Sequence, residues 1–212
     1  METENIRISA LLYSITGLIV LELAALVTIP EKVFTPMGSL GLKRLLEIAF
    51  FLFLFSRRPA GLSQIGLAKN QLVPGIKRGI LWSAAFGLLV GVLFISVFLY
   101  GINPSDLIKG SPQGGGPGKL LLFLLVGAFI APIAEEIFFR GILYGFLRQW
   151  GVAPALVVST LLFVLIHPHP SYIQAVGGLL FAVSYEIEQK LMTPIIIHIL
   201  GNTALVLWPL IF

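Results

Sequence analysis

The sequence contains no cysteine and a single aspartate, Asp106, which limits the chemistry that it can support. Without cysteine there are no disulfides, no thiolate metal sites and no cysteine nucleophile. A catalytic pair of aspartates is impossible. The HExxH pattern of zinc proteases does not occur, and no serine stands in a GxSG-like setting.

Charge is also scarce. Asp, Glu, Lys and Arg make up 11% of the chain, whereas a soluble domain carries roughly 25%. Hydrophobic residues make up 57%, and the mean hydropathy is +0.98. These values predict a polytopic membrane protein that lies in a lipid bilayer. The basic residues fall in short loops, so the net charge of +4 indicates membrane topology, and no nucleic-acid partner is expected.

Seven apolar segments are long enough to be helices, because about 20 apolar residues span a hydrocarbon core of ~30 Å. We therefore predict an all-α polytopic membrane protein of about seven transmembrane helices, with a catalytic core in the last four. A polar loop is expected over 57–78 and a flexible loop over 101–118. The chain shows no internal repeat, which favours one membrane domain (1–212) made of N-terminal helices (1–100) and the core (119–208). The predicted segments are 8–29, 40–56, 79–100, 119–149, 152–167, 172–187 and 191–211.

The distribution of basic residues predicts the orientation. Eight Lys and Arg residues lie on the side that holds the N-terminus and five on the other, leaving out Arg140, which lies inside a segment. Because cytoplasmic loops carry the excess of positive charge, the N-terminus is expected to be cytoplasmic. The first apolar run is too long for a signal peptide. The expected location is the bacterial cytoplasmic membrane.

Three ionisable residues, Glu135, Glu136 and Arg140, lie together inside the fourth apolar segment. Charges at membrane depth cost several kcal/mol unless they are paired or hydrated. Glu136 and Arg140 are four residues apart and can pair on one helix face. Glu135 points ~100° away and lacks this partner. Pro132 frees a backbone carbonyl and can kink the helix. A structural ion pair would explain Glu136 and Arg140 but would leave Glu135 unexplained.

Two further motifs bring polar groups into the last segments. The sequence FVLIH ends at His167, and HILGN places His198 and Asn202 four residues apart on one face. With a rise of ~1.5 Å per residue, Glu135 and His167 lie roughly 21 and 24 Å from the side that holds Trp150. His198 and Asn202 lie roughly 10 and 16 Å from that side. The four residues can therefore meet near the middle of the membrane.

The N-terminal segments hold two more glutamates. Glu22 is alone in the first segment and is expected to contact another helix or to mark a bend. Glu47 has Lys43 and Arg44 within one helical turn and is expected to be neutralised locally.

One carboxylate, two imidazoles and one amide suggest hydrolysis by an activated water. Glu135 could take a proton from water, His167 could hold that water, and His198 and Asn202 could stabilise the oxyanion. Alternatively, Glu135, His167 and His198 could bind zinc. Asn202 is an unusual zinc ligand, which favours the metal-free scheme. We therefore predict no cofactor, with zinc as the alternative.

The three motifs, in this order on successive apolar segments, resemble those of the CPBP family of CAAX proteases and bacteriocin-processing enzymes. They are Glu135-Glu136-x-x-x-Arg140, Phe163-x-x-x-His167 and His198-x-x-x-Asn202, between Lys119 and Trp208. The resemblance implies an all-α intramembrane endopeptidase, related to type II CAAX prenyl endopeptidases, with a membrane-associated protein or peptide as substrate. By position it implies that Glu135 is the base, that His167 helps to hold the water, and that His198 and Asn202 bind the oxyanion. Members are described both as metalloproteases and as glutamate-dependent proteases.

Two other functions remain open at this stage. The same fold could serve as a non-proteolytic membrane scaffold or a bacteriocin-immunity protein, although a scaffold needs no unpaired glutamate. A transporter or proton relay would also use buried carboxylates and histidines. The lack of repeat symmetry between the two halves argues against a transporter.

Overall fold

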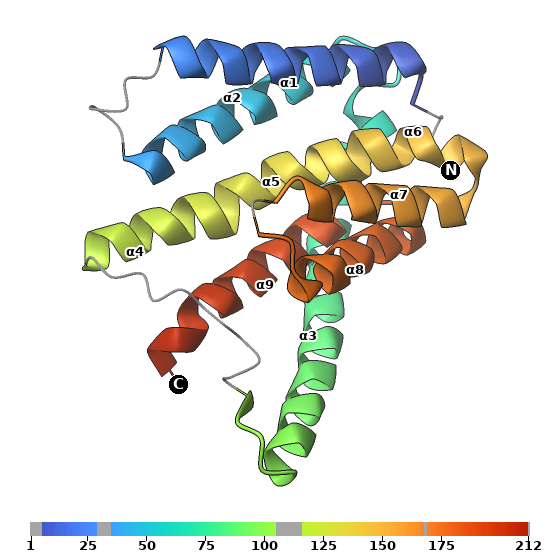
Figure 1. Ribbon diagram of the computed structural model, residues 1–212. Helices are drawn as coiled ribbons and strands as arrows, with labels where there is room; N and C mark the ends of the chain where they lie inside the picture. Colours follow the sequence, from blue (N-terminus) through green and yellow to red (C-terminus); the bar gives the residue numbers. More distant parts are fainter. Residues whose placement is uncertain (1–5, 29–34, 105–115, 168, 212) are drawn as a thin grey trace.

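The computed structural model describes residues 6–28, 35–104, 116–167 and 169–211. Within these ranges the chain is helical and contains no strand, which confirms the all-α prediction (Figure 1). The predicted loop over 101–118 lies outside the described residues between 105 and 115. Seven long helical segments follow one another: α1 (Ile8–Thr28), α2 (Pro36–Ser56), α3 (Lys69–Leu99), the continuous helical segment 117–150, α7 (Val152–Leu165), α8 (Tyr172–Glu188) and α9 (Met192–Ile211).

Four stretches of the described residues are long and apolar enough to cross a membrane. They are Ile8–Thr28, Gly61–Leu99, Pro117–Trp150 and Met192–Leu210. Helix α7 is apolar but shorter, and α2 carries Lys43, Arg44 and Glu47 along its length. Many large apolar side chains of α1 and α3 are exposed, as expected for helices in contact with lipid. The chain is an integral membrane protein.

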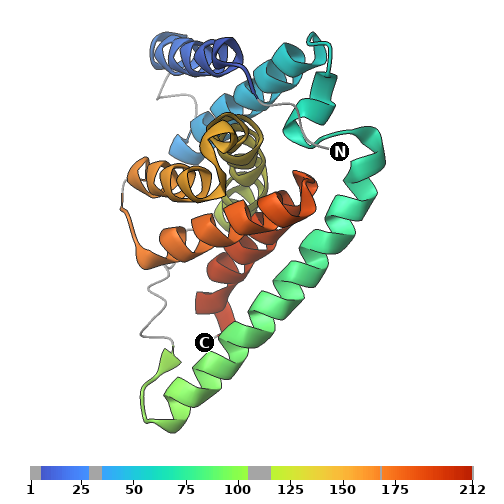
Figure 2. The ribbon, with the colours of Figure 1, turned by 90° about the vertical axis from the view of Figure 1, so that its right-hand side faces the viewer.

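The segment 117–150 runs through the middle of the molecule (Figures 1 and 2). Helices α1 and α2 lie on one side of it, and α7, α8 and α9 lie on the other. Helix α3 packs along α9, and its C-terminal end projects beyond the rest of the molecule (Figure 2). Large buried side chains, among them Phe51 and Phe55 of α2 and Phe163 of α7, fill the core around the central segment. The residues of the fourth segment are therefore surrounded by other helices.

The prediction of a polar loop over 57–78 was wrong in its second half. A 3₁₀ turn occupies Gly61–Ile65 (η1), but α3 already begins at Lys69, ten residues before the predicted segment. Pro74 and Gly75 look like helix breakers, yet both lie inside α3. A Cβ atom on Gly75 would come within 2.7 Å of Met192 Cβ, so this glycine allows α3 to approach α9 closely.

The two glutamates of the N-terminal helices have partners of the kinds that the sequence predicted. Lys43 Nζ on α2 lies 2.8 Å from Glu22 Oε2 on α1, so Glu22 does contact another helix. Arg44 Nη1 lies 2.7 Å from Glu47 Oε2 within α2.

Candidate active site

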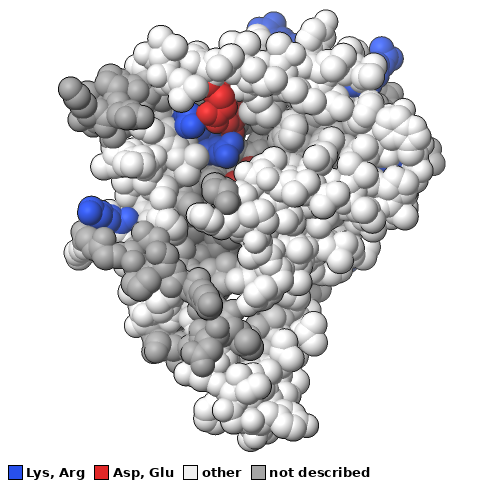
Figure 3. All heavy atoms as spheres, in the orientation of Figure 1, with Lys and Arg blue, Asp and Glu red and all other residues white. Residues whose placement is uncertain are grey.

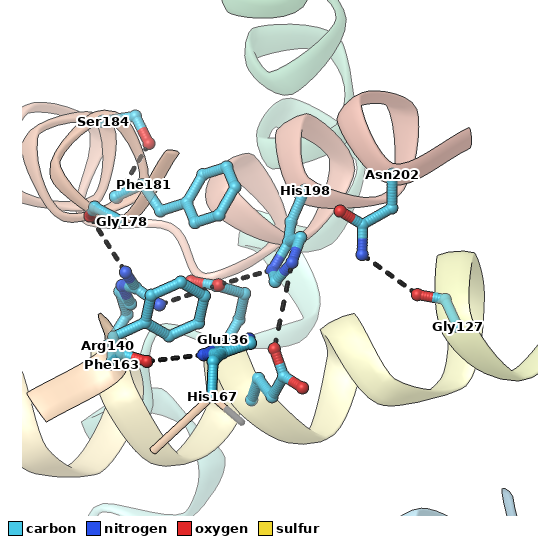
Figure 4. A network of polar contacts seen from close by, with 11 residues as sticks. Gly127, Glu136, Arg140, Phe163, His167, Gly178, Phe181, Ser184, His198 and Asn202 are labelled. Atoms are coloured by element: carbon cyan, nitrogen blue, oxygen red, sulfur yellow. Dashed lines mark hydrogen bonds and ion pairs between the residues drawn. The ribbon is translucent and has the colours of Figure 1, made fainter. Parts of the chain in front are cut away.

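The charged residues of the central segment form a buried network with α8 and α9 (Figure 4). Arg140 Nη1 donates to Oε1 of Glu136 at 2.9 Å, and both side chains are fully buried. His198 Nδ1 lies 2.8 Å from the same Oε1 atom. Arg140 Nη2 donates to the carbonyl oxygen of Gly178 on α8 at 2.9 Å. The predicted Glu136–Arg140 pair is confirmed, and it also ties α8 and α9 to the central segment.

The central segment is not a regular α-helix around these residues. Two π-helical stretches, η3 (Leu124–Ile130) and η4 (Ile137–Tyr144), flank the short α5 (Ala131–Glu136) that carries both glutamates. The remainder is made of α4 (Pro117–Phe123), α6 (Gly145–Leu147) and the 3₁₀ turn η5 (Arg148–Trp150). π-Helical turns are rare and are frequent at functional sites. Pro132 falls in the first turn of α5, directly after η3.

Glu135 lines a cavity of about 160 Å³ on the side of α5 that faces α1 and α2. Its side chain is 13% exposed, and its Oε2 lies 3.9 Å from His198 Nε2. As predicted, Glu135 does not share the arginine that pairs with Glu136. Figure 3 shows acidic and basic side chains together in a hollow on the face where α1 and α2 adjoin the central segment. The residues that line the cavity are Leu18, Arg44, Glu47, Ala134, Glu135, Phe138, Phe139 and Ile166.

The two histidines are oriented through their Nδ1 atoms. His167 follows the end of α7, and its Nδ1 lies 2.7 Å from the carbonyl oxygen of Phe163. His198 Nδ1 contacts the Glu136 carboxylate. Carbonyl and carboxylate oxygens only accept hydrogen bonds, so Nδ1 is the protonated nitrogen in both rings. The Nε2 atom of each histidine is thereby left to interact with a ligand or a water molecule.

Aromatic rings separate the charged network from its surroundings. The Phe163 ring lies between the two imidazoles, with centroid distances of 4.8 Å to His167 and 5.8 Å to His198. Phe181 stacks on His198 at 4.4 Å. The Arg140 guanidinium lies 4.5 Å from the centroid of Phe163 and 5.3 Å from that of Phe181. These rings fix the orientation of the imidazoles and lower the local polarity.

Asn202 lies one helical turn beyond His198 on α9. Its Nδ2 donates to the carbonyl oxygen of Gly127 in η3 at 3.0 Å. Within the described ranges, no hydrogen bond joins Asn202 to Glu135, His167 or His198. The structure therefore brings Glu135 and His198 together, connects His167 to them through Phe163, and places Asn202 one turn away.

A zinc ion in this site would need at least three protein ligands. Glu135, His167 and His198 are the ligands that a zinc ion would need. In the part of the chain that the structure describes, no three His, Asp or Glu side chains are grouped so that they could hold a metal ion. The arrangement of the described side chains does not fit a three-ligand zinc site.

Comparison with known proteins shows what the C-terminal part of the chain is similar to. Residues 117–204 match the family model described as type II CAAX prenyl endopeptidase Rce1-like. The matched range contains Glu135, Glu136, Arg140, His167, His198 and Asn202. The match covers less than half of the chain, and it makes this part of the chain similar to the CAAX protease family. The resemblance seen in the three sequence motifs is thereby confirmed over this part of the chain.

A curated relative supports the assignment. The chain is 31% identical over 102 residues to the membrane-embedded CAAX protease MroQ of Staphylococcus aureus, which is 44% of this chain and 41% of the relative. The chain thus spans less than half the length of this relative. No solved structure matches the chain. Helices α1, α2 and α3 lie outside the range of the family match.

The sequence alone did not predict three contributors to this site. Arg44 on α2 lines the cavity together with Glu135, although only its local partner Glu47 was foreseen. Phe181 on α8 covers one face of His198. The Gly127 carbonyl binds Asn202. All three depend on contacts between helices far apart in the chain, and no local sequence signal marks them.

Proposed function

We propose that this protein is an intramembrane endopeptidase that hydrolyses a peptide bond of a membrane-associated protein or peptide. The proposal depends mainly on the position of Glu135. This carboxylate lacks the arginine that neutralises Glu136, lines a cavity, and has an imidazole 3.9 Å from its Oε2. A carboxylate that faces a cavity, and that forms no direct ion pair with an arginine among the described residues, is suited to accept a proton from water.

In the proposed reaction, Glu135 removes a proton from a water molecule in the cavity. The resulting hydroxide attacks the carbonyl carbon of the scissile peptide bond, and the carbonyl oxygen becomes the oxyanion of a tetrahedral intermediate. The C–N bond then breaks, and the amine leaves after it receives the proton that Glu135 accepted. The cavity, of about 160 Å³, is large enough to hold water molecules.

The oxyanion would be stabilised by His198 and Asn202. Since Nδ1 of His198 donates to Glu136, only Nε2 can face the oxyanion. Donation from Nε2 requires the imidazolium form, in which both ring nitrogens carry protons. The Asn202 amide has two N–H groups, and only one of them is needed for the hydrogen bond to Gly127.

His167 would hold the attacking water. Its Nδ1 is engaged by the Phe163 carbonyl, so Nε2 can accept a hydrogen bond from a water molecule. Ile166, the residue before it, lines the cavity that holds Glu135. Glu136 and Arg140 would act as positioning residues for the His198 ring.

The test is cleavage by the full-length protein in liposomes. Quenched-fluorescence peptides, including C-terminal CAAX peptides and single-span membrane peptides, are offered to the wild type and to Glu135→Gln, and mass spectrometry identifies the products. We expect cleavage by the wild type and none by Glu135→Gln, which keeps the shape of the side chain but removes the base. Glu186→Gln is the matched control, because it removes a carboxylate that hydrogen-bonds Arg148 and Tyr144 outside the cavity. Normal cleavage by a folded Glu135→Gln protein would refute the proposal.

A further inference from the structure

Arg44 is held rigidly on α2 at the wall of the cavity. Its Nη1 donates to Oε2 of Glu47 at 2.7 Å, and the Glu47 side chain is only 2% exposed. The Arg44 side chain itself is 24% exposed. The buried carboxylate therefore holds the guanidinium of a residue that lines the cavity, while part of the Arg44 side chain stays exposed.

Most of the hydrogen-bonding capacity of Arg44 is unused. A guanidinium carries five N–H donors. Among the described residues, its one hydrogen bond is the bond to Glu47, and its Nε atom is buried with no acceptor. A hydrogen-bond donor that is shielded from water and has no acceptor lowers the stability of the protein. A site that retains such a donor is suited to a ligand that supplies acceptor oxygens.

The location of Arg44 indicates that this ligand is the peptide substrate. Arg44, Glu47 and Glu135 line the same cavity, with Arg44 on α2 and Glu135 on α5. The neighbouring Lys43 does not line the cavity and pairs with Glu22 instead. A peptide placed so that Glu135 can direct water onto one of its bonds would therefore bring its backbone close to Arg44.

We propose that Arg44 binds the substrate by donating hydrogen bonds to a main-chain carbonyl oxygen beside the scissile bond. This inference rests on the proposed function. An unfolded peptide segment at membrane depth has carbonyl oxygens that neither water nor a helix satisfies. The cavity walls carry two carboxylates, Glu47 and Glu135, against one guanidinium. This balance of charge favours a neutral carbonyl oxygen over a substrate carboxylate, which the two glutamates would repel.

The test compares variants in the liposome assay with the peptide that the wild type cleaves fastest. Arg44→Gln/Glu47→Gln removes both members of the pair, so no uncompensated buried charge remains. Lys43→Gln is the matched control, because it removes the adjacent positive charge from the same helix but from outside the cavity. Binding of the same peptide is measured by fluorescence anisotropy in the Glu135→Gln background, which needs no activity.

We expect the double variant to raise KM about tenfold or more, as expected for a lost charged hydrogen bond, with kcat changed less than threefold. The peptide Kd should rise by a similar factor, and Lys43→Gln should behave like the wild type. Unchanged KM and Kd in a folded double variant would overturn the inference, as would a fall in kcat alone. If the double variant does not fold, Arg44→Lys decides, because it keeps the charge but loses the planar fork, and its KM should rise at least threefold.

A second arm separates carbonyl from carboxylate recognition. The same peptide is supplied with a free C-terminal carboxylate and with a C-terminal amide. The Arg44 variants should raise KM by the same factor for both forms of the peptide. If it disappears with the amide, Arg44 binds the terminal carboxylate and the carbonyl assignment is wrong. If the wild type cleaves no peptide at all, the proposed function itself fails. If the wild type cleaves peptides but the Arg44 variants have the same KM, only the inference about Arg44 fails.

Discussion

His198 Nδ1 and Glu136 Oε1 lie 2.8 Å apart, and the same carboxylate oxygen also accepts the hydrogen bond from Arg140. One oxygen atom therefore connects two helices: α9, through its histidine, and the central segment, through its arginine. The sequence predicted Glu136 only as the partner of Arg140. The contact with His198 gives it a second role, because it fixes the ring that lies 3.9 Å from Glu135.

The first prediction concerns the stability of this network. Glu136→Ala and Arg140→Ala should each lower the free energy of unfolding by about 3–5 kcal/mol, because either change leaves an uncompensated buried charge. Both side chains are 0% exposed. Reversible unfolding in mixed micelles measures the loss. Activity should fall in both variants, since the His198 ring loses its fixed orientation.

Arg148→Ala provides the comparison for that measurement. Arg148 pairs with Glu186 at 2.8 Å, but its side chain is 39% exposed at the end of the central segment. Exposed ion pairs contribute about 0–1 kcal/mol. If Arg148→Ala and Arg140→Ala lower the free energy of unfolding equally, burial is not what makes the Glu136–Arg140 pair important for stability.

Local patterns explain what could be predicted. The hydrophobic segments follow from the length needed to cross a bilayer, and the Glu136–Arg140 pair follows from the i,i+4 spacing of a helix. Each of these signals lies within about 20 residues of sequence. The order of the three motifs was enough to identify the resemblance to the CAAX protease family, which the match over 117–204 confirms.

The rest of the site depends on tertiary contacts that no local pattern encodes. Arg44 reaches the cavity because α2 packs beside α5, and Phe181 reaches His198 because α8 packs beside α9. The π-helical stretches have no recognisable sequence signal. The start of α3 was missed because the basic, Pro and Gly residues of 57–78 favour a loop, whereas Gly75 lies inside α3 and allows the close contact with Met192.

The second prediction tests that packing. Gly79→Ala should destabilise the protein by about 1–3 kcal/mol, because the added Cβ would meet Ile196 Cβ at 2.6 Å and the Thr193 carbonyl oxygen at 2.9 Å. Gly87 lies two turns further along α3 and has open space around it. Gly87→Ala should be neutral or stabilising by up to ~1 kcal/mol, since alanine favours the helix. Unfolding measurements that rank the two variants in the opposite order would show that α3 does not pack on α9 in this way.

The third prediction separates two roles for Asn202. If its second N–H binds the oxyanion, Asn202→Ala should lower kcat by about 10²–10³-fold, while the lost bond to Gly127 costs only about 1 kcal/mol of stability. Thr203→Ala is the control, because the neighbouring hydroxyl donates to Ile199 within its own helix. Steady-state kinetics and melting curves are compared for both. A variant that loses stability but keeps kcat would limit Asn202 to joining α9 and η3.

The fourth prediction is that catalysis does not require a metal. A zinc ion would need Glu135, His167 and His198 as ligands, which would leave no free carboxylate to act as base. Glu136 cannot replace Glu135, because its Oε1 is already shared by Arg140 and His198, and its Oε2 is buried away from the solvent. We therefore expect the purified active protein to contain less than stoichiometric zinc and to keep its activity after exhaustive chelation. Elemental analysis and the liposome assay, performed on the same preparation, measure both quantities. Activity that is lost on chelation and restored by zinc alone would instead make Glu135 a ligand, and the general base would have to be sought elsewhere in the cavity, where Glu47 is the remaining carboxylate.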